Sequence, residues 1–318
     1  MLNSSQKIIV NICTFKRPKM LKSCLDSVLA QQLPENWQLE VHIVDNASDS
    51  TLAEDVQIWG TTTPVPLRYW IEPRRGIPYA RNTACEQSLK HQADWVVFID
   101  DDELACKGWL NAYAKAVSQY TADAYTGPVK YIFPSDSADW LANKNKYGTA
   151  DGANQTRAAT NNVMIAKHVI STDGMNLSFD NQMTMTGGSD SDFFKRVVAD
   201  GGKIVFVKNA LVSEEVLPNR ISIFWRLKRK HRSSSNRIYI YIKLYGFKRT
   251  ILISLKKSVE HLLHGTIGLI CSPLFLVAGK NKFKRRFYHA LRHYAELSGI
   301  LFGLFGRHPQ PYRVTDGY

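Results

Sequence analysis

Four consecutive acidic residues are the part of this chain with the clearest chemical meaning. Asp100, Asp101, Asp102 and Glu103 follow the apolar residues 95–99, which read as a buried parallel strand. Adjacent carboxylates repel each other unless positive charge lies among them, and open α/β sheets bind ligands at the carboxyl ends of their strands. A divalent cation carrying a phosphorylated ligand accounts for both facts. The alternative is a solvated acidic turn that opens the next helix.

Three further predicted strands also end in polar segments, at residues 13–18, 45–51 and 74–82. Each segment alone is explained by a turn, a helix N-cap or a solvated surface. The carboxyl ends of parallel strands meet at one edge of a sheet. Together the four segments therefore offer hydrogen bonds for a base and a ribose, cations for a phosphate, and carboxylates for a metal.

The elements that must position these residues alternate between strand and helix. Strands are predicted at 8–12, 39–44, 67–71, 95–99, 162–166 and 204–207, and helices at 18–31, 50–59, 78–91, 108–120 and 190–199. This order predicts an α/β protein with a mainly parallel, doubly wound sheet flanked by helices. Residues 143–160 read as a long loop, and we expect donor selectivity to lie within 129–160.

The charge divides the chain into two parts. The 318 residues include 41 Lys and Arg and 28 Asp and Glu, a net charge of +13. From Asn219 onwards there are 20 Lys and Arg against three acids, or +17, so residues 1–218 carry 21 against 25, or −4. We therefore predict a catalytic domain at 1–220 and a basic, aromatic-rich, mostly helical region at 221–318.

An uncharged run at residues 262–279, flanked by cations and aromatic residues, is typical of interfacial membrane helices. It is short and interrupted by Pro273, which favours peripheral attachment to an anionic membrane over a spanning helix. A soluble helical cap is the third possibility. The five scattered cysteines lack CxxC spacing, which indicates a reducing compartment. Residues 1–7 do not read as a signal peptide, so we expect a cytoplasmic location.

In combination the motifs resemble glycosyltransferase family 2, the inverting enzymes of the GT-A fold. The likeness is strongest to the bacterial polysaccharide branch that includes succinoglycan-type glucosyltransferases. It runs in order through about the first 245 residues. The matching segments are 14–18, 44–49, Gly76 with 80–82, 98–103, 160–163, 187–192 and 214–220. The resemblance implies a GT-A, Rossmann-like sheet with a basic helical extension.

The resemblance also implies which residues bind the nucleotide. Asp45 corresponds to the carboxylate that hydrogen-bonds the base, and Thr14 and Phe15 line the same pocket. Arg81 corresponds to the cation near the nucleotide, and Arg17 belongs to the same set of nucleotide-binding residues.

A metal site is implied by the acidic run. Asp100 and Asp102 resemble the two ends of the DXD signature, in which the first acid faces the ribose and the second holds the metal. Because Asp101 is also acidic, the assignment could shift by one, so Asp101 is counted among the nucleotide-binding residues. Mg²⁺ or Mn²⁺ fits an all-oxygen site completed by the diphosphate.

The proton acceptor is implied by a second acidic cluster. An inverting transfer needs a base that takes the proton from the acceptor hydroxyl, and Asp190 matches the family's acid at this helix start. Many relatives have Glu immediately before it, where this chain has Ser189, so Asp192 competes for the role. One of Glu214 and Glu215 is a further candidate for the site.

These residues predict an inverting transferase that moves a sugar from a nucleotide-diphosphate sugar, a UDP-sugar by resemblance, to a lipid-linked or membrane-bound glycan. Bacterial polysaccharide or lipopolysaccharide biosynthesis is the expected pathway, on the inner face of the inner membrane. A nucleotidyltransferase is disfavoured because residues 13–18 contain no glycine. A nucleic-acid-binding protein is disfavoured because that reading leaves the acidic run unexplained.

Overall fold

The computed structural model describes residues 5–47, 49, 51–135 and 148–310. The strands are β1 (Gln6–Thr14), β2 (Trp37–Asp45), β3 (Leu67–Ile71), β4 (Trp95–Asp100), β5 (Glu103–Ala105), β6 (Ala124–Thr126), β7 (Val129–Ile132), β8 (Asn154–Gln155), β9 (Asn162–Ala166), β10 (Ile204–Phe206) and β11 (Val212–Glu215). The α-helices are α1 (Pro18–Leu29), α2 (Ala53–Thr61), α3 (Ile77–Lys90), α4 (Trp109–Gln119), α5 (Lys167–Ile170), α6 (Ser189–Ala199), α7 (Ile223–Tyr245), α8 (Phe247–Cys271) and α9 (Lys280–Leu304). Three 3₁₀ turns are η1 (Asn181–Met183), η2 (Pro218–Arg220) and η3 (Ser272–Leu276).

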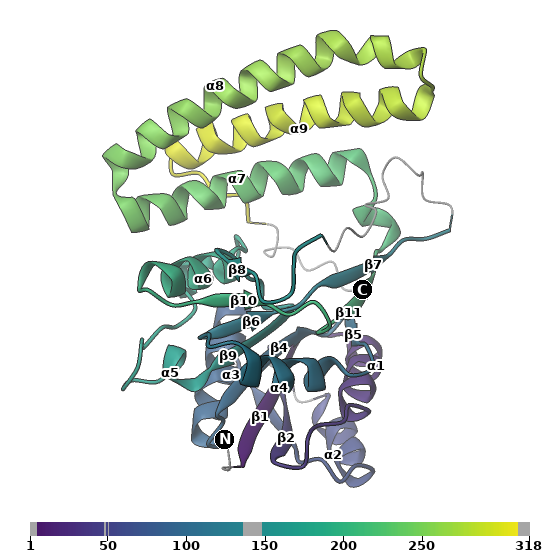
Figure 1. Ribbon diagram of the computed structural model, residues 1–318, viewed down its shortest axis with the longest axis vertical. Helices are drawn as coiled ribbons and strands as arrows, with labels where there is room; N and C mark the ends of the chain where they lie inside the picture. Colours follow the sequence, from purple (N-terminus) through teal and green to yellow (C-terminus); the bar gives the residue numbers. More distant parts are fainter. Residues whose placement is uncertain (1–4, 48, 50, 136–147, 311–318) are drawn as a thin grey trace.

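The strands form one large and one small sheet. The eight-stranded sheet has the order β3-β2-β1-β4-β9-β6-β10-β8, and the small sheet has the order β5-β11-β7. Strands β3, β2, β1 and β4 are parallel to one another, whereas β9 lies antiparallel between β4 and β6. The prediction of a mainly parallel sheet flanked by helices is confirmed (Figure 1).

Each central strand sends alternate side chains into two separate cores. From β1, Ile8 and Val10 enter a core that includes buried residues of α1, α2 and α4, whereas Ile9 enters a core with residues of α3 and α6. Burial on both faces explains why these strands read as continuous apolar runs. It also fixes the register, and therefore which residues end each strand at the sheet edge.

The predicted helices and the longer strands lie within a few residues of their observed bounds. The start of the helix predicted at 50–59 includes Ser50, which lies outside the described residues, and α2 begins at Ala53. Part of the predicted loop at 143–160, residues 143–147, also lies outside them. Its remainder contains the short strand β8. The sequence did not predict β5 to β8 or β11, because strands of two to four residues carry no usable periodicity.

A helical layer covers the carboxyl edge of the large sheet (Figure 1). Helix α7 lies next to the sheet, and α8 and α9 form an antiparallel pair on its outer side. Gly246, with a φ of 77°, separates α7 from α8. Beyond α8 the chain continues through Pro273 into η3, so the apolar run predicted at 262–279 is the second half of α8 together with η3.

Candidate active site

The parallel register brings the predicted site residues to one edge of the large sheet. Thr14 pairs with Asp45 across β1 and β2, and Cys13 pairs with Asp100 across β1 and β4. Three adjacent strands therefore end in polar side chains at the same level. The third predicted segment joins this edge through Arg81 of α3, whose Nη2 lies 3.9 Å from Asp100 Oδ1.

The middle acid of the run is buried and fully engaged. Asp101 accepts a hydrogen bond from Thr14 Oγ1 at 2.7 Å and forms an ion pair with Arg17 Nη1 at 3.2 Å. Burial raises the pKa of Asp101 to about 6, against the opposing effect of Arg17. These contacts commit Asp101 to Thr14 and Arg17, and Asp100 and Asp102 are the more exposed acids of the run.

Asp100 and Asp102 belong to an acidic cluster whose members share their arginine partners. Asp102 Oδ2 lies 3.4 Å from Arg17 Nη1 and 3.5 Å from Arg220 Nη2. The side chain of Asp100 is 46% exposed. The surrounding protein still withdraws it from bulk water, and this desolvation raises its pKa to about 7 in spite of Arg81. A carboxylate whose charged form is disfavoured in this way would be stabilised by an added cation.

Two glutamates, Glu103 and Glu214, lie near Asp100 and Asp102 and enlarge the acidic cluster. Glu103 is buried, accepts hydrogen bonds from the Asp100 main-chain N–H and from Asn161, and has a pKa raised well above its usual value by burial. Glu214 forms an ion pair with Arg220 at 2.9 Å, whereas Glu215 is exposed. Of the two glutamates proposed from the sequence, Glu214 is therefore the one that lies with the acids.

Asp45 is held in a fixed orientation at the end of β2. Its Oδ1 accepts a hydrogen bond from the Ala47 N–H at 2.9 Å, and its Oδ2 accepts one from the Tyr69 hydroxyl at 2.8 Å. Burial raises the pKa of Asp45, and these two hydrogen bonds oppose the rise. Phe15 is half-buried beside this edge, with the Arg75 guanidinium 5.6 Å from its ring centroid.

The second acidic cluster lies at the start of α6. Gly188 caps this helix with a φ of 89°, a left-handed conformation that favours glycine. Arg81 Nη1 donates a hydrogen bond to Ser189 Oγ at 3.2 Å, which ties the helix start to the sheet edge. Asp190 is half-buried and is close enough to Asp100 to contribute to the raised pKa of that residue.

Asp190 and Asp192 lie in different surroundings. Asp190 Oδ1 accepts a hydrogen bond from the Ser191 N–H at 2.7 Å. Asp192 is fully buried, and its Oδ2 lies 2.7 Å from Arg196 Nη2 and 3.5 Å from Lys243 Nζ. The structure therefore places Asp190 near Asp100 and places Asp192 in an ion pair between α6 and α7.

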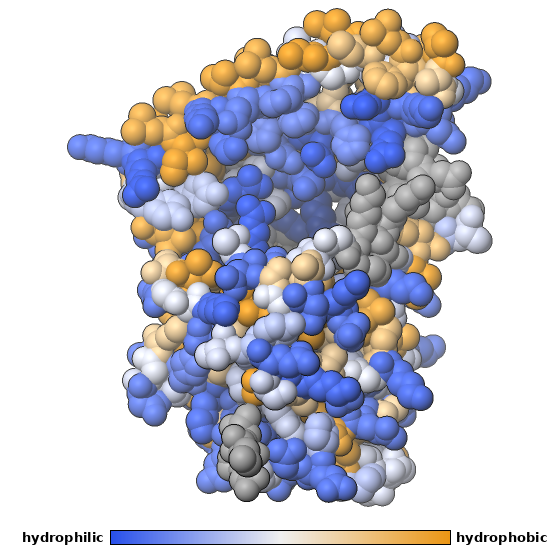
Figure 2. All heavy atoms as spheres, in the orientation of Figure 1, coloured by the Kyte–Doolittle hydropathy of each residue, from blue (hydrophilic) through white to orange (hydrophobic). Residues whose placement is uncertain are grey.

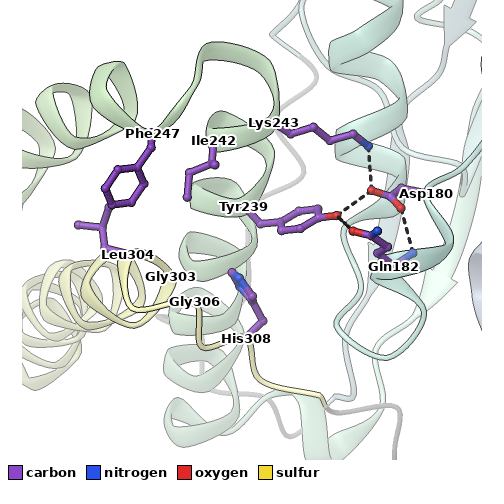
Figure 3. A pocket seen from close by; sticks show the side chains of 10 residues that line it. All are labelled: Asp180, Gln182, Tyr239, Ile242, Lys243, Phe247, Gly303, Leu304, Gly306 and His308. Carbon is purple, nitrogen blue, oxygen red and sulfur yellow. Dashed lines mark hydrogen bonds and ion pairs between the residues drawn. The ribbon is translucent and has the colours of Figure 1, made fainter.

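Helix α7 holds the loop that precedes α6. Asn236 donates hydrogen bonds to the main-chain oxygens of Thr186 and Gly187, at 2.9 and 2.6 Å. Lower on α7, Lys243 and Tyr239 both bind Asp180 in a pocket of about 510 Å³ (Figure 3). None of the residues that line this pocket is a predicted site residue.

The donor set at the acidic run suits a hard divalent cation. Asp100 and Asp102 offer only carboxylate oxygens, and Mg²⁺ is usually held by one or two carboxylates together with substrate phosphates and water. Among the described residues, the one group of three possible ligands within 4.8 Å is Glu40, His42 and His91. Glu40 already binds Lys7 at 2.8 Å and both histidines, so that group is an internal ion-pair network.

Sequence reasoning missed two residues that hold the site in place, Tyr69 and Asn236. Tyr69 lies within a predicted strand, where it pairs with Ile43 of β2, two residues before Asp45, so only the folded sheet reveals its hydrogen bond to that carboxylate. Asn236 lies in a basic helix 49 residues from Gly187, and nothing in the local sequence distinguishes it. Arg220 is part of a motif recognised in the sequence, but its contact with Asp102 is visible only in the folded chain.

Comparison with known proteins gives a consistent result. The family model described as "Glycosyl transferase family 2" matches residues 9–175. The chain is 28% identical over 306 residues, 95% of each chain, to the succinoglycan biosynthesis protein ExoM of Rhizobium meliloti (strain 1021).

Two solved structures resemble almost the whole chain. The mannosyltransferase PcManGT from Pyrobaculum calidifontis, in complex with GDP-Man and Mn²⁺, has a TM-score of 0.59 at 17% identity and covers 95% of this chain and 88% of its own. S. aureus TarS 1-349, in complex with UDP-GlcNAc, has a TM-score of 0.55 at 13% identity and covers 98% and 95%. At these identities the likeness establishes the architecture of the chain.

Proposed function

The chain belongs to glycosyltransferase family 2 and has the GT-A fold, and on this basis we propose an inverting, metal-dependent transferase. It moves a sugar from a nucleotide-diphosphate sugar, in our proposal a UDP-sugar, to a hydroxyl of a lipid-linked or membrane-bound glycan. The observation that carries the proposal is the meeting of Asp45, Asp100 and Asp102 at one sheet edge, with Asp190 beside it.

Donor binding is assigned to the ends of β1 and β2. A carboxylate offers about four acceptor sites, and Asp45 uses two of them on Ala47 and Tyr69. Asp45 is almost fully buried, and in our proposal its remaining sites would accept an N–H of the base or a ribose hydroxyl. Thr14 and Phe15 would line the same pocket, and Arg81, next to Asp100, would lie near the nucleotide phosphates.

The departing diphosphate is assigned to the acidic run. Asp100 and Asp102 would hold Mg²⁺ or Mn²⁺, which supplies positive charge for the diphosphate when it is bound. Asp101 fixes Arg17 at 3.2 Å, and Arg17 would add a second positive charge beside the leaving group. Arg220 bridges Asp102 and Glu214, which keeps the acids of this cluster from repelling each other.

Asp190 is our proposed base. The acceptor oxygen forms its bond to the anomeric carbon while the bond from that carbon to the diphosphate oxygen breaks, and Asp190 takes the hydroxyl proton. The carboxylate of Asp190 is half-buried and held at Oδ1 by the Ser191 N–H. Asp192 is the weaker candidate because Arg196 and Lys243 already bind its carboxylate.

The proposed pathway is supported by one relative, and the proposed location by the basic region. ExoM is described as a succinoglycan biosynthesis protein, which supports bacterial surface polysaccharide or lipopolysaccharide as the product. We propose residues 1–220 as the catalytic domain and residues 221–318 as the region that attaches the enzyme to the inner face of the inner membrane. In the described chain, one helical segment, Phe247–Leu276, is long and apolar enough to cross a membrane by length and composition.

The proposal is tested by incubating the protein with a panel of nucleotide sugars and Mg²⁺ or Mn²⁺ and measuring the released nucleoside diphosphate. Asp102→Ala and Asp190→Ala are measured alongside, with and without bacterial lipid-linked glycans. Metal-dependent release from one donor that both variants lose would support the proposal and identify the sugar. Absence of release from every donor, with acceptors present, would count against it.

A further inference from the structure

Helix α8 exposes its large aliphatic side chains on the outside of the molecule. The stripe consists of Leu252, Leu255, Val259, Leu263, Ile267 and Ile270, and it continues with Leu274 of η3 and with Val277, the residue after η3. The spacing of three or four residues places the six residues of α8 on one helix face. At its far end Ile270 is 72%, Leu274 73% and Val277 96% exposed. A continuous apolar surface of this kind marks an interaction site.

The opposite face of α8 is small and polar, although it is the face that packs against the protein. Thr250, Ser254 and Gly265 are buried there. A Cβ at Gly265 would lie 2.9 Å from the ring of Tyr294 in α9, so the two helices approach closely only because this residue is glycine. A water-exposed surface helix has the reverse distribution, with its apolar face inward. The apolar face of α8 is therefore suited to contact with an apolar environment outside the protein.

Cations border the apolar stripe. In α8, Lys248, Arg249, Lys256 and Lys257 accompany the first half of the stripe, and Lys280, Lys282, Lys284, Arg285 and Arg286 follow its end at the start of α9. The sequence has no acidic residue between Glu260 and Glu296. Such a surface attracts an anionic partner and repels a second copy of itself.

We propose that the outer face of α8 and η3 docks on a bilayer that contains anionic phospholipids, with α8 lying flat in the interface. This inference rests on the proposed membrane location of the acceptor and specifies the surface that reaches the membrane. Apolar side chains enter the boundary between headgroups and acyl chains, and the flanking cations contact the phosphates.

A spanning orientation of α8 is disfavoured by its partner helix. Along its length α8 packs against α9, and α9 carries Arg292 and the cationic start described above. Insertion of the pair across a membrane would move these charges, and Glu260 of α8, into the hydrocarbon region, where each charged side chain costs about 3 kcal/mol or more. A flat orientation leaves all of them in water or among headgroups.

Docking in this orientation sets the distance between the membrane and the carboxyl edge of the large sheet. The apolar surface lies along one end of the molecule, and α9 and α7 separate it from the carboxyl edge of the sheet (Figures 1 and 2). Figure 2 shows a hollow bordered by hydrophilic residues beneath the helical layer. Helices α9 and α7 would therefore hold this hollow about 20 Å from the membrane surface, a distance that the glycan of a lipid-linked acceptor would have to span.

The test is flotation of the full chain with vesicles of phosphatidylethanolamine and phosphatidylglycerol, compared with vesicles of phosphatidylcholine alone. We expect binding to the anionic vesicles that weakens with salt, and a loss of at least about ten-fold in the Ile267→Asp/Ile270→Asp variant. The matched control is Ile58→Asp, because Ile58 is also exposed but lies on α2. The control should bind like the unmodified chain.

Folding and catalysis are measured separately in the same variants. The double variant should retain its circular dichroism spectrum and its donor hydrolysis, so a failed proposal for catalysis and a failed proposal for docking give different results. Release of the bound chain by alkaline carbonate is expected for a flat helix, and resistance to it would overturn the flat orientation. Equal flotation of all three proteins would overturn the proposal. It would also be overturned if no protein bound vesicles and the unmodified chain formed a dimer that the double variant could not form.

Discussion

Asn236 of α7 donates a hydrogen bond to the main-chain oxygen of Gly187 over 2.6 Å, so the basic helical layer directly holds the loop that begins α6. The second amide hydrogen binds the Thr186 oxygen, and Asn236 itself is buried. The helical layer is consequently part of the support of Asp190 as well as the carrier of the apolar face. The proposed docking surface and the proposed base therefore depend on the same structural unit.

Replacement of Asn236 by leucine should lower kcat more than it changes donor binding. The similar side-chain volume is kept, but two buried carbonyl oxygens lose their donor, which costs about 1–3 kcal/mol of stability. Small displacements of a catalytic group reduce rates strongly, and we expect kcat to fall about ten-fold. The donor KM should stay unchanged, because the proposed nucleotide contacts lie at the sheet edge. Steady-state kinetics at a temperature where the variant is folded measures both.

The matched control for this variant is Ser233→Leu, at an exposed position on the same helix. It should leave kcat, KM and unfolding unchanged. An Asn236→Leu enzyme with equal losses in donor affinity and kcat would show that the residue supports the fold in general and has no particular effect on Asp190.

Asp190 and Asp192 should respond in opposite ways to replacement by asparagine. Asp190→Asn removes the proposed base and should reduce kcat by at least about 100-fold. Its Oδ1 can still accept the Ser191 hydrogen bond, so the unfolding temperature should hold. Asp192→Asn leaves Arg196 and Lys243 without a buried carboxylate and should destabilise the fold by about 3 kcal/mol. The folded fraction of that variant should retain its activity.

Activity and calorimetric unfolding of the two variants distinguish the assignments. Loss of activity in a fully folded Asp192→Asn enzyme, with Asp190→Asn active, would transfer the role of the base to Asp192.

Asp100 should make the metal-free protein less stable as the pH rises. Its pKa is raised to about 7 from 3.8, so above pH 4 the unfolded chain releases a proton that the folded chain retains. Folding stability therefore falls between about pH 4 and 7. Asp100→Asn should remove this loss, and after allowance for the partial exposure of the side chain we expect a gain of about 1 kcal/mol near pH 8.

Denaturant unfolding at about pH 4 and pH 8 tests this pH dependence. The gain should disappear at the lower pH, and the same variant should lose transferase activity at both. Mg²⁺ or Mn²⁺ should stabilise the unmodified chain more at the higher pH, because protons compete for the same carboxylate. A gain of equal size at both pH values would show that the ionisation of Asp100 is not its cause.

The sequence predicts the parts of this site that depend on strand order, and it misses those that depend on distant packing. Thr14, Asp45 and Asp100 could be placed together because apolar runs identify parallel strands and parallel strands end at one edge. The contacts of Asn236 and Arg220 could not be placed, because they join segments with no shared periodicity. The small sheet was missed for the same reason, since β11 pairs with β7 across more than 80 residues.

Tyr69→Phe should weaken donor binding without slowing the chemical step. The hydroxyl of Tyr69 holds Asp45 Oδ2 at 2.8 Å and opposes the rise that burial causes in the pKa of Asp45. Without the Tyr69 hydroxyl, the Asp45 carboxylate is less fixed and more easily protonated. The proposed hydrogen bonds between Asp45 and the nucleobase therefore weaken, most of all at low pH. We expect the donor KM to rise about ten-fold with kcat unchanged, the pattern of lost uniform binding. The ratio between the affinities for two different nucleotides should fall by a similar factor.

The control for this prediction is Tyr120→Phe, which removes a comparable hydrogen bond to Asp151, at 3.0 Å. Tyr120 lies at the end of α4, outside the predicted site residues. Its loss should change stability slightly and leave the donor KM as it was. Nucleotide affinity measured by calorimetry for UDP and GDP completes the comparison, since Asp45 can favour one base only while its orientation is held. Equal nucleotide affinities in both variants would mean that Asp45 does not contact the base, and the donor pocket would then have to be placed elsewhere along this edge.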